Sequence, residues 1–155
     1  MRARKIVVAS FLIFLAAYAN GQQEQRFVLL PASEARNLAE MYPKDGPEKI
    51  NGSWQPTKSQ IESLEANLHH VSDLKSFGAP KSERIEHPEQ YFRQYLAVVR
   101  DGQNLIYINS FCQIQNISNW RNHIAIVMDG GTCFWQARYD PATERFLNLY
   151  INGRA

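Results

Sequence analysis

The chain has 155 residues, of which 45% are hydrophobic and 21% charged, so it can build one ordinary domain and is not largely disordered. Its formal charge is +2, but three of its basic residues, Arg2, Arg4 and Lys5, precede an apolar run that we expect to be removed. The rest of the chain holds 14 basic and 15 acidic residues, a net charge of −1, which gives no support for a nucleic-acid binder or a protein of anionic membrane surfaces.

Residues 1–19 predict a secretory signal peptide. A basic start is followed by an apolar run from Ile6 to Ala17, in which only Ser10 is polar, and then by a small residue at Ala19. The run is short for a membrane span, which needs about 20 residues. An uncleaved N-terminal anchor is the alternative. We expect cleavage after Ala19, which places the protein in the periplasm or outside the cell with no membrane span left.

Residues 20–26 are polar and are expected to form a disordered lead-in to a single domain over residues 27–155. A short helix is expected after Ser33, which can cap it. Its apolar residues recur with helical spacing at Ala35, Leu38, Ala39 and Tyr42. Residues 43–56 contain three prolines and two glycines and are interpreted as a loop.

The clearest helix is expected to begin at Thr57, because Gln60 completes a capping-box pattern with it. One apolar stripe then follows at Ile61, Leu64, Leu68, Val71 and Leu74. Gly78 and Pro80 are expected to end this long helix, and residues 79–90 are interpreted as a polar linker.

From Tyr91 onward the apolar period changes to two, which indicates strands. The segments Tyr91–Val99 and Asn104–Cys112 flank Asp101-Gly102, a strong hairpin signal. A two-residue turn places Gln94 opposite Asn109. Both faces of this hairpin are partly apolar, so we expect the long helix to cover one face and residues 27–42 the other.

Three further strands are expected. The segments Trp120–Met128 and Thr132–Tyr139 flank a turn at Asp129–Gly131, and a last strand over Arg145–Asn152 follows a type I turn. In the preferred register of the last strand, three aliphatic side chains face inward: Leu147, Leu149 and Ile151. The expected fold class is therefore α+β, with one long helix and a shorter N-terminal helix packed on a curved antiparallel meander of about five strands. This arrangement is cystatin-like by analogy.

Five segments form a recognisable pattern: Tyr91–Tyr95, Leu105–Asn109, Asp129–Trp135, Tyr139–Thr143 and Asn152–Ala155. Together they resemble a group of small exported bacterial proteins of uncharacterised function. The resemblance covers about residues 54–155. It implies a bacterial, exported protein, and it implies no site residues, because the group has no known activity.

The two cysteines, Cys112 and Cys133, form a possible disulfide. In an exported protein two cysteines usually pair. In a simple meander, however, Cys112 ends the second strand and Cys133 begins the fourth, so they would lie on the order of 20 Å apart. A disulfide needs Cα atoms within about 7 Å. Either the bond is absent or the meander is wrong.

The sequence shows no catalytic or metal-binding motif. The four histidines do not form a His-Glu-x-x-His motif, and neither a Cys-x-x-Cys nor a Gly-x-Ser-x-Gly motif is present. We therefore assign no catalytic residue and expect neither a metal nor a cofactor.

The candidate binding residues lie in the predicted strands: Arg93, Gln94, Tyr107, Asn109 and Arg138. Arginine and aromatic residues are enriched at interfaces, and every basic residue after Tyr91 is an arginine. The two amides either bond each other on a partly wet face or line a pocket.

The function expected from these features is an exported, soluble binding or interaction module. Its partner would be a protein, a cell-envelope component or a small ligand held against the sheet. The alternative is a small hydrolase that uses the concave face of the sheet.

Overall fold

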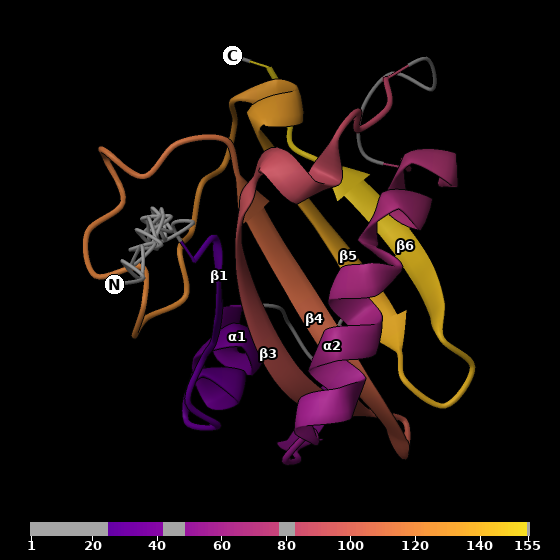
Figure 1. The fold of residues 1–155 in the computed structure, drawn as a ribbon. Coiled ribbons are helices and arrows are strands. Elements are labelled where there is room, and N and C mark those ends of the chain that lie inside the picture. Colours follow the sequence, from indigo (N-terminus) through magenta and orange to yellow (C-terminus); the bar gives the residue numbers. More distant parts are fainter. Residues whose placement is uncertain (1–24, 42–48, 78–82, 155) are drawn as a thin grey trace, which may run out of the picture.

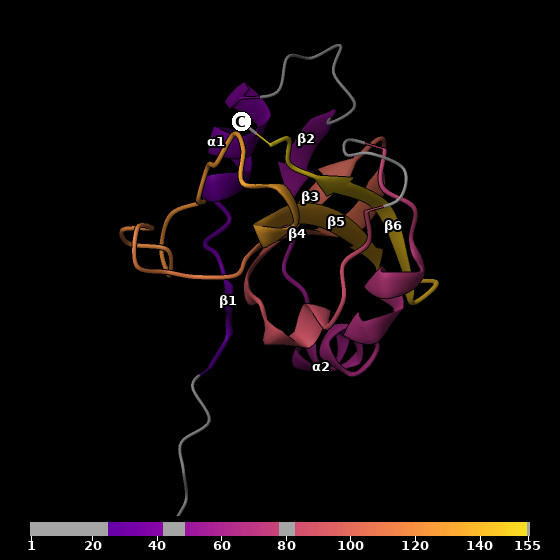
Figure 2. The ribbon, with the colours of Figure 1, turned by 90° about the horizontal axis from the view of Figure 1, so that it is seen from above.

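The computed structural model describes residues 25–41, 49–77 and 83–154, and their fold is α+β. A curved six-stranded sheet carries the two α-helices on opposite faces (Figures 1 and 2). The strands are β1 (Phe27–Leu29), β2 (Ile50–Ser53), β3 (Phe92–Arg100), β4 (Gln103–Phe111), β5 (Phe134–Asp140) and β6 (Arg145–Ile151). The helices are α1 (Glu34–Met41) and α2 (Lys58–Ala66), with 3₁₀ turns η1 (Leu68–Asp73), η2 (Pro88–Gln90) and η3 (Gly131–Cys133). The predicted signal peptide and residues 20–24 of the predicted lead-in lie outside the described residues.

The predicted β3–β4 hairpin is confirmed with its register. Gln94 lies opposite Asn109, and Phe92 lies opposite Phe111. Asp101 and Gly102 have positive φ angles of 48° and 78°, and a two-residue type I′ turn requires positive φ at both positions.

The prediction of a purely antiparallel sheet of five strands is wrong. The sheet is mixed, because β1 pairs with the first half of β3 in parallel, while β2 pairs with the second half in antiparallel fashion. The predicted loop over residues 43–56 thus contains a strand at Ile50–Ser53. These two strands have three and four residues, which is too short to show a period of two in the sequence.

The prediction of one long helix is also wrong. The capping box is present, since the Thr57 side chain accepts from the Gln60 backbone and the Gln60 side chain accepts from the Thr57 backbone. However, α2 ends at Ala66 and continues as η1. The spacing of Leu68, Val71 and Leu74 explains the change, because apolar residues exactly three apart suit the three residues per turn of a 3₁₀ helix. The stripe stays continuous and faces the core.

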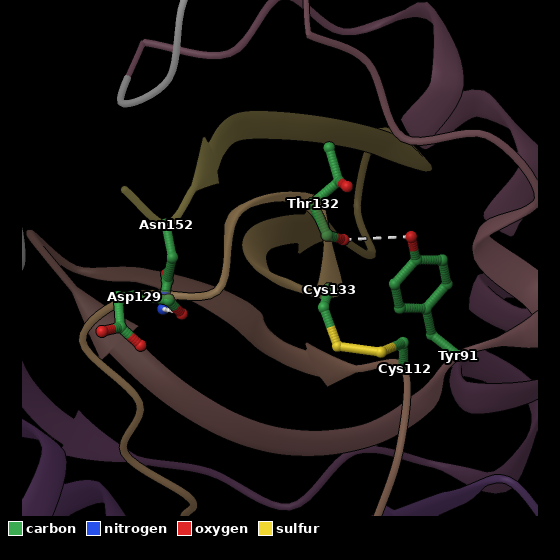
Figure 3. Close-up of a disulfide and its surroundings, with 6 residues drawn as sticks. All are labelled: Tyr91, Cys112, Asp129, Thr132, Cys133 and Asn152. Atoms are coloured by element: carbon green, nitrogen blue, oxygen red, sulfur yellow. Dashed lines mark hydrogen bonds between the residues drawn. A yellow bond between two sulfur atoms is a disulfide. The ribbon is translucent and has the colours of Figure 1, made fainter. Parts of the chain in front are cut away.

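No strand forms at Trp120–Met128, although the sequence predicts one. Residues 112–133, which we call the disulfide loop, leave the end of β4 and return at the start of β5. β4 and β5 therefore pair directly, with Phe111 opposite Phe134. Cys112 and Cys133 lie one position beyond this pair, with Cα atoms 4.9 Å apart, and form a disulfide (Figure 3). The meander predicted with a strand at Trp120–Met128 is therefore wrong: β4 and β5 are direct neighbours, and this brings the two cysteines together.

The last strand combines both registers that the sequence allows. Leu149 and Ile151 are buried against the α2 side, as predicted, but Leu147 lies opposite Arg138 on the other face and Phe146 takes the inner position. A bulge in β6 produces this switch of faces, because Gln136 pairs with Tyr150 but Arg138 pairs with Leu147, which leaves β6 one extra residue between the two pairs.

The expectation that part of each face of the sheet is covered is confirmed. One core cluster joins α2 and η1 to the sheet through residues such as Leu64, Tyr95 and Trp135. A second cluster joins α1 to the opposite face through Leu38 and Leu96. In the described ranges, no helix is both long enough and apolar enough to cross a membrane.

Candidate functional site

A pocket of about 300 Å³ lies on the α1 face of the sheet. This volume is at the small end of the range for ligand pockets. Strands β4 to β6, the end of α1, Phe77 and part of the disulfide loop form its walls. The lining residues are Leu38, Met41, Phe77, Tyr107, Asn109, Ile124, Ala125, Ile126, Val127, Met128, Gln136, Ala137, Arg138, Asn148, Tyr150 and Asn152.

Exposed apolar side chains gather at this pocket. In the part of the chain that the structure describes, the large hydrophobic residues that remain exposed are Met41, Phe77, Ile126, Met128 and Tyr150, and all of them line the pocket. Met128 is 86% exposed and Phe77 is 61% exposed. Such a concentration of uncovered apolar surface is typical of an interaction site.

The floor of the pocket is polar and buried. Across the sheet, Tyr107 lies opposite Arg138, and on the next position of the same face Asn109 lies opposite Gln136. Arg138 is 3% exposed and Asn109 is 6% exposed. A few polar groups set into an apolar surface are the usual means of orienting a bound molecule.

Gln94 and Asn109 hold the disulfide loop against the sheet. The Asn109 amide donates to Gln94 Oε1 (2.9 Å) and to the carbonyl of Ala125 (2.8 Å), and Gln94 Oε1 also accepts from the Ala125 N–H (2.8 Å). The Gln94 amide donates to the carbonyls of Trp120 and His123. These side chains replace the neighbouring strand that the segment lacks, and this explains why its alternating sequence does not form a strand.

Glu34 and Asn152 hold two further points of the same loop. The buried Glu34 carboxylate accepts from the Ile124 N–H (2.8 Å) and interacts with His123 Nδ1 (3.2 Å). The Asn152 amide donates to the carbonyls of Val127 (2.5 Å) and Asp129 (3.2 Å), and Figure 3 shows Asn152 beside Asp129. The apolar wall that Ile124 to Met128 contribute is therefore fixed at both ends.

The predicted binding residues do not all share one site. Tyr107, Asn109 and Arg138 line the pocket, and Gln94 supports Asn109 from outside it. Arg93 lies on the opposite face, where its guanidinium contacts Glu65 of α2 and the Tyr95 hydroxyl.

Sequence reasoning missed the rim residues and two of the loop's anchors. Met41, Phe77 and Met128 come from three segments that are distant in the sequence and meet only in the fold. Glu34 carried a usable signal, because it precedes Leu38 by four residues and so shares the apolar face of α1.

On the face opposite the pocket, the contacts among Arg93, Tyr95 and Glu65 shift the pKa values of Arg93 and Tyr95. Burial raises the pKa of Tyr95 well above its usual value, so the hydroxyl stays neutral. Burial works to lower the pKa of Arg93, but interactions with Tyr95 and Glu65 outweigh it and raise that pKa, so the guanidinium stays charged. Arg93 and Glu65 form an ion pair, with Nη2 and Oε2 3.0 Å apart, and this pair fastens α2 to the sheet.

The alanine variant of Asn109 is expected to lose about 2 kcal/mol of unfolding free energy, since it leaves Gln136 and the Ala125 carbonyl without their Asn109 partner. Chemical denaturation measures this loss. Asn122→Ala is the matched control, because Asn122 is exposed and bonds only locally to Asn119, and its change is expected to stay within about 0.5 kcal/mol. Equal losses in both variants would contradict the anchoring role.

Known proteins and known metal-site patterns add no assignment. No protein-family model, curated protein or solved structure matches the chain. Within the described residues, no group of three or more His, Cys, Asp and Glu side chains could hold a metal ion.

Proposed function

We propose that the protein is an exported binding module whose pocket holds an apolar group of its ligand. The observation that carries this proposal is the gathering of exposed apolar side chains around one polar-floored pocket. Covering apolar surface contributes about 25 cal/mol for each Å² removed from water. A ligand that covers this rim therefore gains affinity from surface that the fold leaves open.

Export is part of the same proposal. The basic, apolar and small-residue pattern of residues 1–19 supports it, and so does the resemblance of residues 54–155 to small exported bacterial proteins. The bond between Cys112 and Cys133 is compatible with export, because disulfides persist in oxidising compartments.

Binding has more support than hydrolysis at this pocket. Its described lining residues include no Ser, Cys, His, Asp or Glu. A hydrolytic site needs a nucleophile, or an activated water, beside a base. The lining residues instead offer apolar contact, amide groups and one guanidinium.

Methionine NMR is expected to detect ligand binding directly. Two of the chain's three methionines, Met41 and Met128, line the pocket. Both ¹³C-methyl signals should therefore shift when a small neutral apolar probe, 1-octanol or indole, is titrated. Ile126→Ser should weaken binding of the probe about fivefold, which corresponds to about 1 kcal/mol of lost apolar contact.

Ile126→Leu is the matched control, since it keeps the apolar volume and both methionine reporters. Binding by this variant should equal that of the unaltered protein. If saturating probe shifts neither methionine signal, the pocket is not a binding site for apolar groups and the proposal fails.

A further inference from the structure

One wall of the pocket carries backbone groups without partners. The wall is the segment 124–128 of the disulfide loop, and all five of its residues line the pocket. Side chains of the sheet bond the N–H and C=O of Ala125 and the C=O of Val127. Among the described residues, none bonds the backbone N–H or C=O of Ile126 or Met128.

The segment alternates as an extended strand does. Ile124 packs against the core cluster on the α1 side, whereas Ala125 packs against the cluster that contains Phe92. This alternation of side chains is that of a β-strand, in which the backbone groups of successive residues also point to opposite edges. The bonded groups of Ala125 therefore lie on one edge, and the backbone groups of Ile126 and Met128 lie on the other, which we call the free edge.

The free edge is open to a partner. Ile126 and Met128 are both exposed. The Ile124 N–H belongs to the same edge and already donates to the carboxylate of Glu34 (2.8 Å), so this edge bonds an acceptor where one is within reach. An exposed strand edge with unpaired N–H and C=O groups is a template for a further strand.

Resting on the proposed function, we propose that the partner is an extended peptide of another protein, which adds to the free edge as a strand. Its backbone bonds that of Ile126 and Met128, and every second side chain lies beside theirs on the pocket side. The volume of about 300 Å³ equals that of about ten liquid waters, so the pocket takes about two leucine side chains. A second copy of this chain fits less well, because its own Ile126 and Met128 side chains already line its own pocket.

The test compares two peptides that have the same side chains. The first is acetyl-Thr-Leu-Thr-Leu-Thr-amide, and the second carries N-methyl groups on its second and third residues, one on each edge of the extended chain. The methyl signals of Met41 and Met128 at pH 7 give the Kd of each. The unmethylated peptide is expected to bind about tenfold more tightly, because it keeps the donors that pair with the free edge. It should also slow hydrogen exchange at the Ile126 and Met128 amides, which 1-octanol should not do.

Ile126→Pro tests the free edge itself. Proline has no N–H and is a residue that blocks pairing at a strand edge. Among the described residues none accepts from the Ile126 N–H, so the segment keeps its anchors to the sheet. The ratio of the two Kd values should fall to about onefold in this variant and stay at about tenfold in Ile126→Val, which keeps the N–H and an apolar side chain.

Circular dichroism checks that both variants fold. If Ile126→Pro does not fold, the two peptides and the exchange at Ile126 in the unaltered protein still decide between strand addition and apolar contact alone.

The outcomes separate the two proposals. Equal binding of the two peptides would overturn strand addition and leave the apolar binding module standing, and so would methionine shifts with 1-octanol but with neither peptide. A tenfold ratio that survives in Ile126→Pro would also overturn it, because the pairing would lie elsewhere. Exchange at Ile126 that slows with protein concentration alone, together with a dimer in sedimentation, would make a second copy the occupant and overturn the peptide. If neither the peptides nor 1-octanol shift the methionine signals, both proposals fail.

Discussion

Replacing Arg93 with alanine is expected to lower the free energy of unfolding by about 3–5 kcal/mol, as breaking a buried ion pair does. Arg93 is 3% exposed and donates to both oxygens of Glu65 (3.2 and 3.0 Å). It also donates to the carbonyls of Pro88 (3.3 Å) and Glu89 (3.0 Å). Alanine would leave the carboxylate and both carbonyls without these donors in a mostly buried setting.

Urea unfolding measures this loss, and Lys58→Ala is its control. Lys58 pairs with Glu62 at 3.1 Å, but both side chains are well exposed, so this variant should change stability by less than about 1 kcal/mol. In a double-mutant cycle, Glu65→Gln and Arg93→Ala should be strongly non-additive. Additive losses would show that Arg93 does not act through Glu65.

Removing the disulfide is expected to cost about 3 kcal/mol. The bond joins residues 21 apart in sequence, and a closed loop of this length restricts the unfolded chain by about that free energy. The double variant Cys112→Ser/Cys133→Ser should therefore unfold at a lower urea concentration. The loop's contacts to Gln94, Asn109 and Glu34 do not involve either cysteine, so the native fold should persist without urea.

A reductant provides the control for the disulfide variant. Dithiothreitol should lower the stability of the unaltered protein to that of the double serine variant and should leave the variant itself unchanged. If the reduced and oxidised proteins unfold at the same urea concentration, the bond does not restrain the chain in the way its loop length implies.

Local signals in the sequence predicted the parts of the fold that depend on neighbouring residues. The Asp101-Gly102 turn determines which residues of β3 and β4 face each other, and the capping box marks where α2 begins. Both signals act over at most a few residues, so one sequence is enough to identify them.

The disulfide loop could not be predicted in the same way. Its segment Trp120–Met128 alternates like a strand, but side chains of Gln94, Asn109 and Asn152 occupy its backbone groups. Whether an alternating segment pairs with a strand or with side chains depends on contacts far away in the sequence. The pocket rim could not be predicted for the same reason, because its residues are also far apart in the sequence.

The candidate site was partly within reach of sequence reasoning. The position of Gln94 next to Asn109 follows from the hairpin register. Arg93 could have been separated from them, because adjacent residues of a strand point to opposite faces. The pairing of Arg138 with Tyr107 was out of reach, since it depends on β4 and β5 being neighbours.

The way β1 and β2 share the edge of β3 imposes an order on folding. Phe27 pairs with Arg93, which lies 66 positions later in the chain, and Ile50 pairs with Arg100. The early segments have no strand to pair with until β3 and β4 have formed their hairpin, and such long-range pairing is slow. α1 follows β1 and carries Leu38 and Met41 to the pocket. We therefore expect the pocket to be completed late in folding, when the N-terminal segment with β1 and α1 docks on the hairpin.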